Sequence, residues 1–200
     1  MKQKNESLFN NLTLNLSNLC GIDEAGRGPI AGPLVVAGVV LHKEIKELND
    51  SKKLSVKKRE ELYEKIKQNS TYFIYKVEAS KIDKIGLSSS LKEALIAIKK
   101  YFGDIDYIFD GNSSFGVDKI NTLVKADSKI KAVSAASILA KVYRDNIMIN
   151  EAKNYPQYGF EKHKGYGTKA HIEAIAKYGY CKIHRQSFKI NLPNKNLTLF

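Results

Sequence analysis

The sequence predicts an α/β protein in which helices cover a β-sheet. Two early apolar runs, residues 19–23 and 34–41, have the length and composition of buried strands. Residues 88–102 place apolar side chains at helical spacing, and such segments alternate with the strand-like runs. Strands interspersed with helices are typical of a layered α/β architecture. With 200 residues, 43% of them hydrophobic, the chain can bury the core of one domain.

The first half of the chain is expected to supply three strands and a helix. The run at 19–23 ends in a pair of acids, and the run at 34–41 is apolar throughout. Ser55 can cap a helix that continues through Lys67, because its hydroxyl can accept a bond from an amide of the first turn. Residues 72–79 alternate well enough between apolar and polar side chains to form a third strand.

The second half predicts further strands and three helices. The helix at 88–102 presents an apolar stripe with the spacing i, i+3, i+4, i+7 and i+11. Residues 107–111 and 120–126 are strand-like runs, each of which ends at or next to an acid. Apolar periodicity then predicts a long helix at about 134–153. A shorter helix at 168–178 should end at the glycine that follows it.

Acidic side chains therefore gather at predicted strand ends, where open α/β sheets usually place their ligands. They are Asp23 and Glu24, Asp110, and Asp127. Taken alone, each has an ordinary alternative: a solvated acidic pair, a turn residue, and a helix cap. Adjacent residues of a regular strand point to opposite faces, so Asp23 and Glu24 can share a site only if the strand bends or ends between them. The nearby Gly26 and Gly28 make such a bend plausible.

A Gly-Arg-Gly turn, Gly26-Arg27-Gly28, directly follows the first acids. Carboxylate oxygens bind hard cations such as magnesium. A glycine turn lets backbone N–H groups approach a phosphate or a sugar closely. The combination indicates metal-assisted chemistry on a phosphodiester, whereas the turn alone could be an ordinary tight turn.

Composition favours a polyanionic partner and gives no sign of a membrane segment. The net charge is +12, with 33 Lys and Arg against 21 Asp and Glu. Cys20 and Cys181 lie far apart and have no metal-ligand spacing, so we expect reduced thiols in a cytoplasmic protein. The longest apolar run, 34–41, falls far short of the roughly 20 residues that span a bilayer.

Taken together, the motifs resemble bacterial ribonuclease HII (type 2 ribonuclease H) over about residues 19–188. The resemblance implies a ribonuclease H-like mixed sheet flanked by helices, with a helical C-terminal part from about residue 155. The matching segments are residues 21–33, 50–54, 109–111, 125–127, 134–145, 163–168 and 184–188.

The same resemblance implies a chemistry. Four acids, here Asp23, Glu24, Asp110 and Asp127, would hold two Mg²⁺ or Mn²⁺ ions and catalyse two-metal phosphodiester hydrolysis. The substrates would be the RNA strand of RNA–DNA hybrids and duplex DNA with a single embedded ribonucleotide, cut on its 5′ side to leave 3′-OH and 5′-phosphate ends. We expect a monomer.

Further residues receive roles from the resemblance. Gly26, Arg27 and Gly28 would sense the ribose 2′-OH through their backbone, and Tyr166 would pack on the following sugar. Candidate phosphate contacts are Lys52, Lys53 and Lys141, although any single lysine is more often simply solvated. His163 is expected to serve backbone binding or structure, because this family holds its metals with carboxylates.

Two other functions remain open from the sequence. The chain could be a related nuclease that acts on DNA alone, or a basic nucleic-acid-binding module without catalysis. Residues 1–18 are predicted to be a polar lead-in, 19–190 the catalytic domain, and 191–200 a flexible tail. Within the tail, Leu197, Leu199 and Phe200 resemble a short motif that binds the bacterial sliding clamp, although they could also pack on the protein itself.

Overall fold

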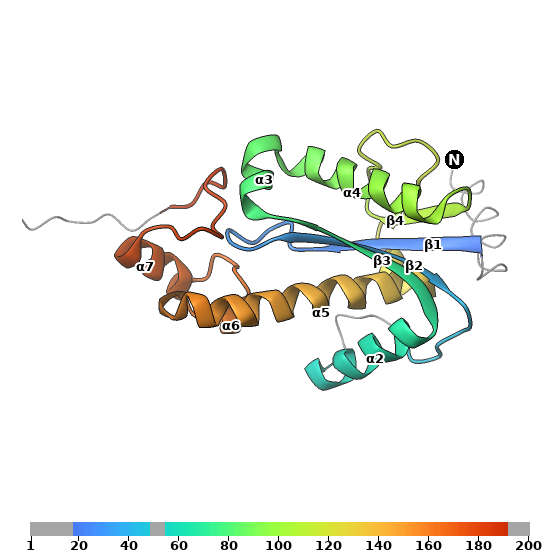
Figure 1. Ribbon diagram of the computed structural model, residues 1–200, viewed down its shortest axis with the longest axis horizontal. Helices are drawn as coiled ribbons and strands as arrows, with labels where there is room; N and C mark the ends of the chain where they lie inside the picture. Colours follow the sequence, from blue (N-terminus) through green and yellow to red (C-terminus); the bar gives the residue numbers. More distant parts are fainter. Residues whose placement is uncertain (1–17, 49–54, 192–200) are drawn as a thin grey trace, which may run out of the picture.

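The computed structural model describes residues 18–48 and 55–191. They form a five-stranded mixed sheet between two helical layers, with a helical extension at one end (Figure 1). The elements are β1 (Leu19–Ala25), β2 (Leu34–Leu41), α2 (Val56–Gln68), β3 (Ser70–Val77), α3 (Ala79–Ile85), α4 (Leu87–Phe102), β4 (Asp106–Asp110), β5 (Asn121–Leu123), η3 (Ala126–Ser128), α5 (Lys131–Asn154), η4 (Pro156–Tyr158), α6 (Phe160–His163) and α7 (Lys169–Tyr178).

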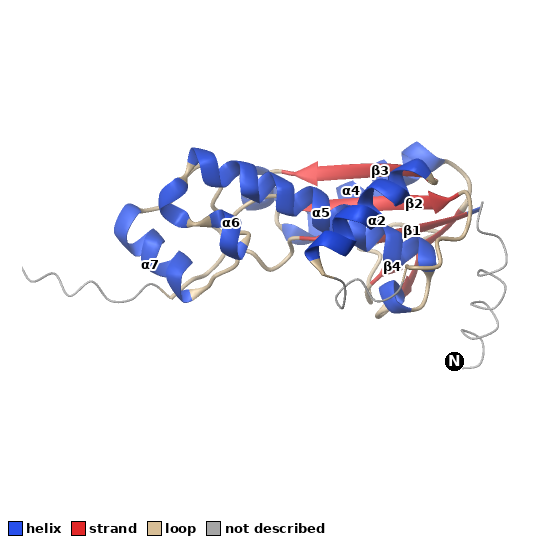
Figure 2. Cartoon of the chain, turned by 90° about the horizontal axis from the view of Figure 1, so that it is seen from below, coloured by secondary structure: helices blue, strands red, loops and turns tan. Residues whose placement is uncertain are grey.

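The sheet order is β3-β2-β1-β4-β5, and β1 lies at its centre. It pairs antiparallel with β2 and parallel with β4. Because strand side chains alternate between faces, β1 divides the core into two layers. Leu19 packs with α2 and α5 on one face, and Ile22 packs with α4 on the other. In Figure 2, α2 and α5 cover the face seen from below.

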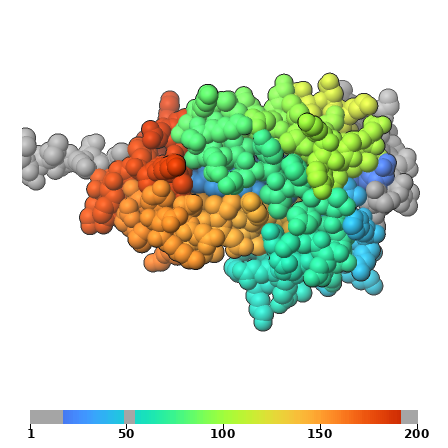
Figure 3. All heavy atoms as spheres, viewed as in Figure 1, coloured from blue at the N-terminus to red at the C-terminus, as the bar shows by residue number. Residues whose placement is uncertain are grey.

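Helix α5 contacts β1 without an intervening side chain. A Cβ at Gly21 would lie 2.2 Å from the carbonyl carbon of Ala132, so only glycine allows this approach. The N-terminal half of the helix is otherwise lined with small and branched apolar residues and is mostly buried. Its C-terminal end leads into η4, α6 and α7, which form one end of the elongated molecule (Figure 3).

Most of the expected elements are confirmed. Ser55 caps α2 by accepting a hydrogen bond from the amide of Lys58, and Gly179 ends α7. Helix α4 covers the expected range within one residue. No helix in the described part of the chain is both long and apolar enough to span a membrane.

Two expectations about local structure were wrong, and one helix was not predicted. The strand predicted at 120–126 is only β5, because Lys125 adopts a left-handed conformation and the chain then enters the η3 turn. Helix α5 begins at Lys131, about three residues earlier than expected. Residues 79–85 form α3, which buries only two side chains and therefore leaves little periodicity in the sequence.

Candidate active site

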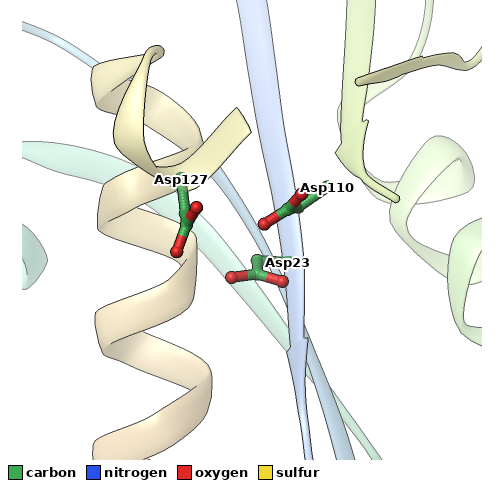
Figure 4. Close-up of side chains that lie close together, drawn as sticks. All are labelled: Asp23, Asp110 and Asp127. Carbon is green, nitrogen blue, oxygen red and sulfur yellow. The ribbon is translucent and has the colours of Figure 1, made fainter. Parts of the chain in front are cut away.

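Three aspartates from separate elements meet at the end of the central strands (Figure 4). β1 and β4 run parallel with Ile22 opposite Phe109, so the next residues, Asp23 and Asp110, lie side by side on the α5 face. Asp127 lies in the η3 turn just before α5. One carboxylate oxygen from each aspartate falls within 4.8 Å of the others. This spacing would allow a single cation to contact all three.

The η3 turn is held to β4 by one of the acids. The amide of Ala126 donates a 3.1 Å hydrogen bond to Oδ1 of Asp110. Asp127 follows at once and is 3% exposed, and Ile130, rather than Asp127, stands at the N-cap of α5. The bond therefore fixes Asp127 beside Asp110.

Glu24 lies beside this group rather than within it. β1 continues to Ala25, so Glu24 points to the opposite face from Asp23, as the alternation rule requires. Its Oε1 lies 3.4 Å from Nη1 of Arg27, and its Oε2 is buried without a hydrogen-bond partner. Glu24 still lines the same cavity as Asp23 and Asp110. Because Glu24 lines the cavity and keeps an unpartnered buried oxygen, it could serve as a further metal ligand.

Burial and neighbouring carboxylates disfavour the charged form of Asp23 and Glu24 in the metal-free protein. Burial and the nearby Glu24 hold the pKa of Asp23 well above its usual range, while a hydrogen bond from Ser137 partly opposes this shift. Burial also raises the pKa of Glu24, and Arg27 partly offsets it. A divalent cation would reverse both effects. The donor set, all carboxylate oxygen, suits Mg²⁺ or Mn²⁺.

The acids open into a cavity of about 440 Å³ that combines acidic, glycine and basic walls. Such a cavity could hold a phosphodiester near the acids while cationic side chains contact its oxygens. The lining residues are Asp23, Glu24, Ala25, Gly26, Arg27, Gly28, Arg59, Asp110, Ser137, Lys141, Arg144 and Tyr166.

The two glycines of the Gly-Arg-Gly turn serve different purposes. Gly26 is buried with φ +99°, and a Cβ there would lie 2.3 Å from Nε of Arg144. Gly28 is exposed, and the nearest neighbour of a Cβ added there would be Cε1 of Tyr166, at 3.8 Å. Gly26 is therefore required by packing inside the protein. Gly28, and not Gly26, leaves backbone open to a ligand.

The structure places Tyr166 and Lys141, both predicted to contact nucleic acid, at the cavity. Tyr166 is 46% exposed beside Gly28, and Lys141 pairs with Asp145 at 2.7 Å. Lys52 and Lys53, like Leu197, Leu199 and Phe200, lie outside the described residues.

Sequence reasoning did not single out three further cavity residues: Arg59, Ser137 and Arg144. Ser137 and Arg144 share a face of α5 with Lys141, at spacings i, i+4 and i+7. A polar stripe on a largely apolar helix is a sequence pattern that could have identified Ser137 and Arg144 as cavity residues. Arg59 on α2 gave none.

Three of the four histidines belong to the packing of the C-terminal part. His171 and His184 are buried, and their Nε2 atoms lie 3.1 Å apart. Nδ1 of His171 donates to the carbonyl of Tyr166, while Nδ1 of His184 accepts from the amide of Cys181. In the part of the chain that the structure describes, His163 also bonds backbone groups, Tyr158 O and Gly165 N. These partners fit the structural role expected for His163.

Strand order, strand-end acids and a basic cavity together define a metal-dependent nuclease of the ribonuclease H class. The model of the family described as Ribonuclease HII matches residues 20–191. The chain belongs to the ribonuclease HII family, whose members act on RNA–DNA hybrids and depend on divalent metal ions.

Several known proteins are similar to this chain. A ribonuclease HII of Sulfurovum sp. is 59% identical over 172 residues, which cover 86% of this chain and 92% of that protein. One from Campylobacter concisus is 52% identical, with 92% and 100% covered. Among solved structures, ribonuclease HII of Archaeoglobus fulgidus, in complex with PCNA, has a TM-score of 0.78 and 29% identity, with 91% and 100% covered.

Replacing Asp23 by Asn should stabilise the metal-free protein at pH 7. The variant keeps an oxygen for the 2.7 Å bond from the amide of Glu24 but removes a buried charge, so unfolding should cost on the order of 1 kcal/mol more. It should also gain less stability than wild type from Mg²⁺. Thermal melts with EDTA or Mg²⁺ measure both, with the exposed Asp104→Asn as control. Equal Mg²⁺ stabilisation of both variants would contradict the metal assignment.

The histidine pair should make the metal-free protein less stable in mild acid. Burial lowers the pKa of His171 to about 4 from an ordinary value near 6.5. The unfolded chain therefore binds the extra proton first, and stability falls as the pH drops from 6.5 towards 4, by up to about 3 kcal/mol. His171→Asn, which can keep the bond to the Tyr166 carbonyl, should flatten this part of the profile. Parallel profiles from urea melts would refute the prediction.

Proposed function

We propose that this protein cuts duplex DNA on the 5′ side of a single embedded ribonucleotide, in addition to cutting the RNA of long hybrids. The observation that supports this most directly is the adjacency of Gly28 and Tyr166 beside the acids in one cavity. Open backbone at Gly28 can exchange hydrogen bonds with a 2′-OH, the group that distinguishes RNA from DNA. The Tyr166 ring offers a flat surface for the neighbouring sugar.

The proposed chemistry is hydrolysis that leaves a 3′-OH and a 5′-phosphate. Asp23, Asp110 and Asp127, with Glu24 at their side, would hold two divalent ions. Such ions, when bound, lower the pKa of an attacking water and stabilise the leaving 3′ oxygen. Lys141, Arg59 and Arg27 supply positive charge along the cavity and would contact the phosphates.

One assay separates this proposal from its alternatives. The protein is incubated with duplexes that contain zero, one or several ribonucleotides, in Mg²⁺, Mn²⁺ or EDTA, and the cut is mapped. Cutting of the all-DNA duplex would favour a DNA nuclease. Salt-dependent binding without metal-dependent cutting would favour a binding module. Cutting of hybrids but not of the single-ribonucleotide duplex would refute the proposed selectivity.

Tyr166→Ala and Gly28→Ala should each reduce cutting at a single ribonucleotide more than cutting of a long hybrid, because a hybrid offers many alternative registers. We expect a loss of about 10-fold or more on the single-ribonucleotide duplex. Gly167→Ala is the matched control, since its added Cβ would keep 3.6 Å from the nearest neighbour, Ile30. Equal losses on both substrates would assign Tyr166 to general binding.

We also propose that the segment at residues 196–200 binds the sliding clamp and so brings the enzyme to newly made DNA. The similar Archaeoglobus structure contains PCNA, and Leu197, Leu199 and Phe200 form an apolar cluster in the sequence. Deleting 196–200 should abolish binding to the purified clamp of the same organism while cutting of a short free duplex stays unchanged. Absence of full-length binding at tens of micromolar would end this proposal.

A further inference from the structure

Two loops meet at the mouth of the cavity, and one side chain lies beneath both. The first loop, residues 26–33, contains the Gly-Arg-Gly turn, and the second, 163–168, contains Tyr166. They touch directly, because the amides of Ile30 and Ala31 both donate to the carbonyl of Gly165, at 2.9 and 3.2 Å. The relative position of Gly28 and Tyr166 therefore depends on what holds this junction.

Arg144 of α5 donates hydrogen bonds to both loops. Its Nε donates to the carbonyl of Pro33 at 2.9 Å, and its Nη2 donates to that of Ala31 at 3.1 Å. Its Nη1 donates to the carbonyl of Lys164 at 2.9 Å. One planar guanidinium thus ties the first loop to the second at three points, a geometry that a lysine ammonium cannot reproduce.

The environment of Arg144 shows that it is built into the junction. The residue is 1% exposed, and it occupies the space that the missing Cβ of Gly26 leaves free. No carboxylate of residues 18–48 or 55–191 forms an ion pair with it. Its guanidinium carbon lies 6.0 Å from the centre of the Tyr166 ring. Within the described part of the chain, its hydrogen bonds go to loop carbonyls.

We propose that Arg144 is a positioning residue for substrate selectivity: it fixes Tyr166 against the open backbone of Gly28. The inference rests on the proposed function, because it explains how Tyr166 and Gly28, the two groups proposed to recognise the ribonucleotide, keep their spacing. Loss of the guanidinium would leave the acids in place and let the Tyr166 loop shift. A shift of about 1 Å at such a group can cost large factors in rate.

The test is a double-mutant cycle between Arg144→Lys and Tyr166→Ala, assayed with Mg²⁺ on the single-ribonucleotide duplex and on a long hybrid. Arg144→Lys alone should lower kcat on the single ribonucleotide about 10-fold, with KM within about twofold, since phosphate contacts persist. In the Tyr166→Ala background, the same change should have little further effect, because the group through which it acts is gone.

Arg185→Lys is the matched control. Arg185 is equally buried, but it donates to the carbonyls of Gly32 and Arg27 in the first loop and does not bond the loop of Tyr166. It should destabilise the fold comparably and lower cutting by a similar factor with or without Tyr166. Additive effects of Arg144→Lys and Tyr166→Ala would overturn the proposal, because Arg144 would then act independently of Tyr166.

Two further outcomes remain decisive. If Arg144→Lys does not fold, Gly165→Ala opens the same junction from the other side, since its Cβ would lie 2.3 Å from the carbonyl oxygen of Ala31. Unchanged selectivity in that variant would overturn the positioning role. If wild type cuts only long hybrids, the proposed function fails, and the coupling measured on the hybrid still decides the role of Arg144.

Discussion

The close contact between α5 and β1 is the constraint on which the site depends. At Gly21 the two backbones meet with no side chain between them, which fixes the start of α5 over the centre of the sheet. The η3 turn just ahead of α5 is therefore held over the end of β4, and Asp127 lies beside Asp23 and Asp110. The same helix then runs along the cavity with Lys141. One backbone contact thus sets both the acidic and the basic wall.

Holding these acids together works against the stability of the metal-free protein. Burial and neighbouring carboxylates disfavour the charge on Asp23, and Glu24 keeps an unpartnered buried oxygen. The surrounding core offsets this cost, because the two apolar layers on either face of β1 are nearly continuous. A cation that binds the folded site then stabilises the fold by mass action. Metal affinity and folding are consequently linked through the same few atoms.

Much of the fold could be predicted from local signals, whereas the division of roles within the site could not. Apolar runs located β1 and β2, and Ser55 marked the start of α2, because these signals lie within a few residues of the element that they specify. Alternation along a strand predicted opposite faces for Asp23 and Glu24 unless the strand bends, and the bend considered plausible there is absent, because β1 continues to Ala25. Gly26 and Gly28, by contrast, look alike in the sequence and differ only through their tertiary neighbours, Arg144 and Tyr166. The left-handed Lys125 that shortens β5 gave no local sign either.

The two loops at the cavity, residues 26–33 and 163–168, lack the hydrogen-bond ladder that makes strands rigid. Their carbonyl groups therefore need other donors. Two buried arginines, Arg144 and Arg185, supply several of these bonds. Together they donate to five loop carbonyls, those of Arg27, Ala31, Gly32, Pro33 and Lys164. An apolar side chain in either place would leave buried acceptors unsatisfied, which costs about 1–3 kcal/mol each. The guanidinium groups therefore hold irregular backbone in a fixed geometry, which the proposed discrimination between a ribose and a deoxyribose would require. They also place positive charge behind the cavity wall that would face the phosphates.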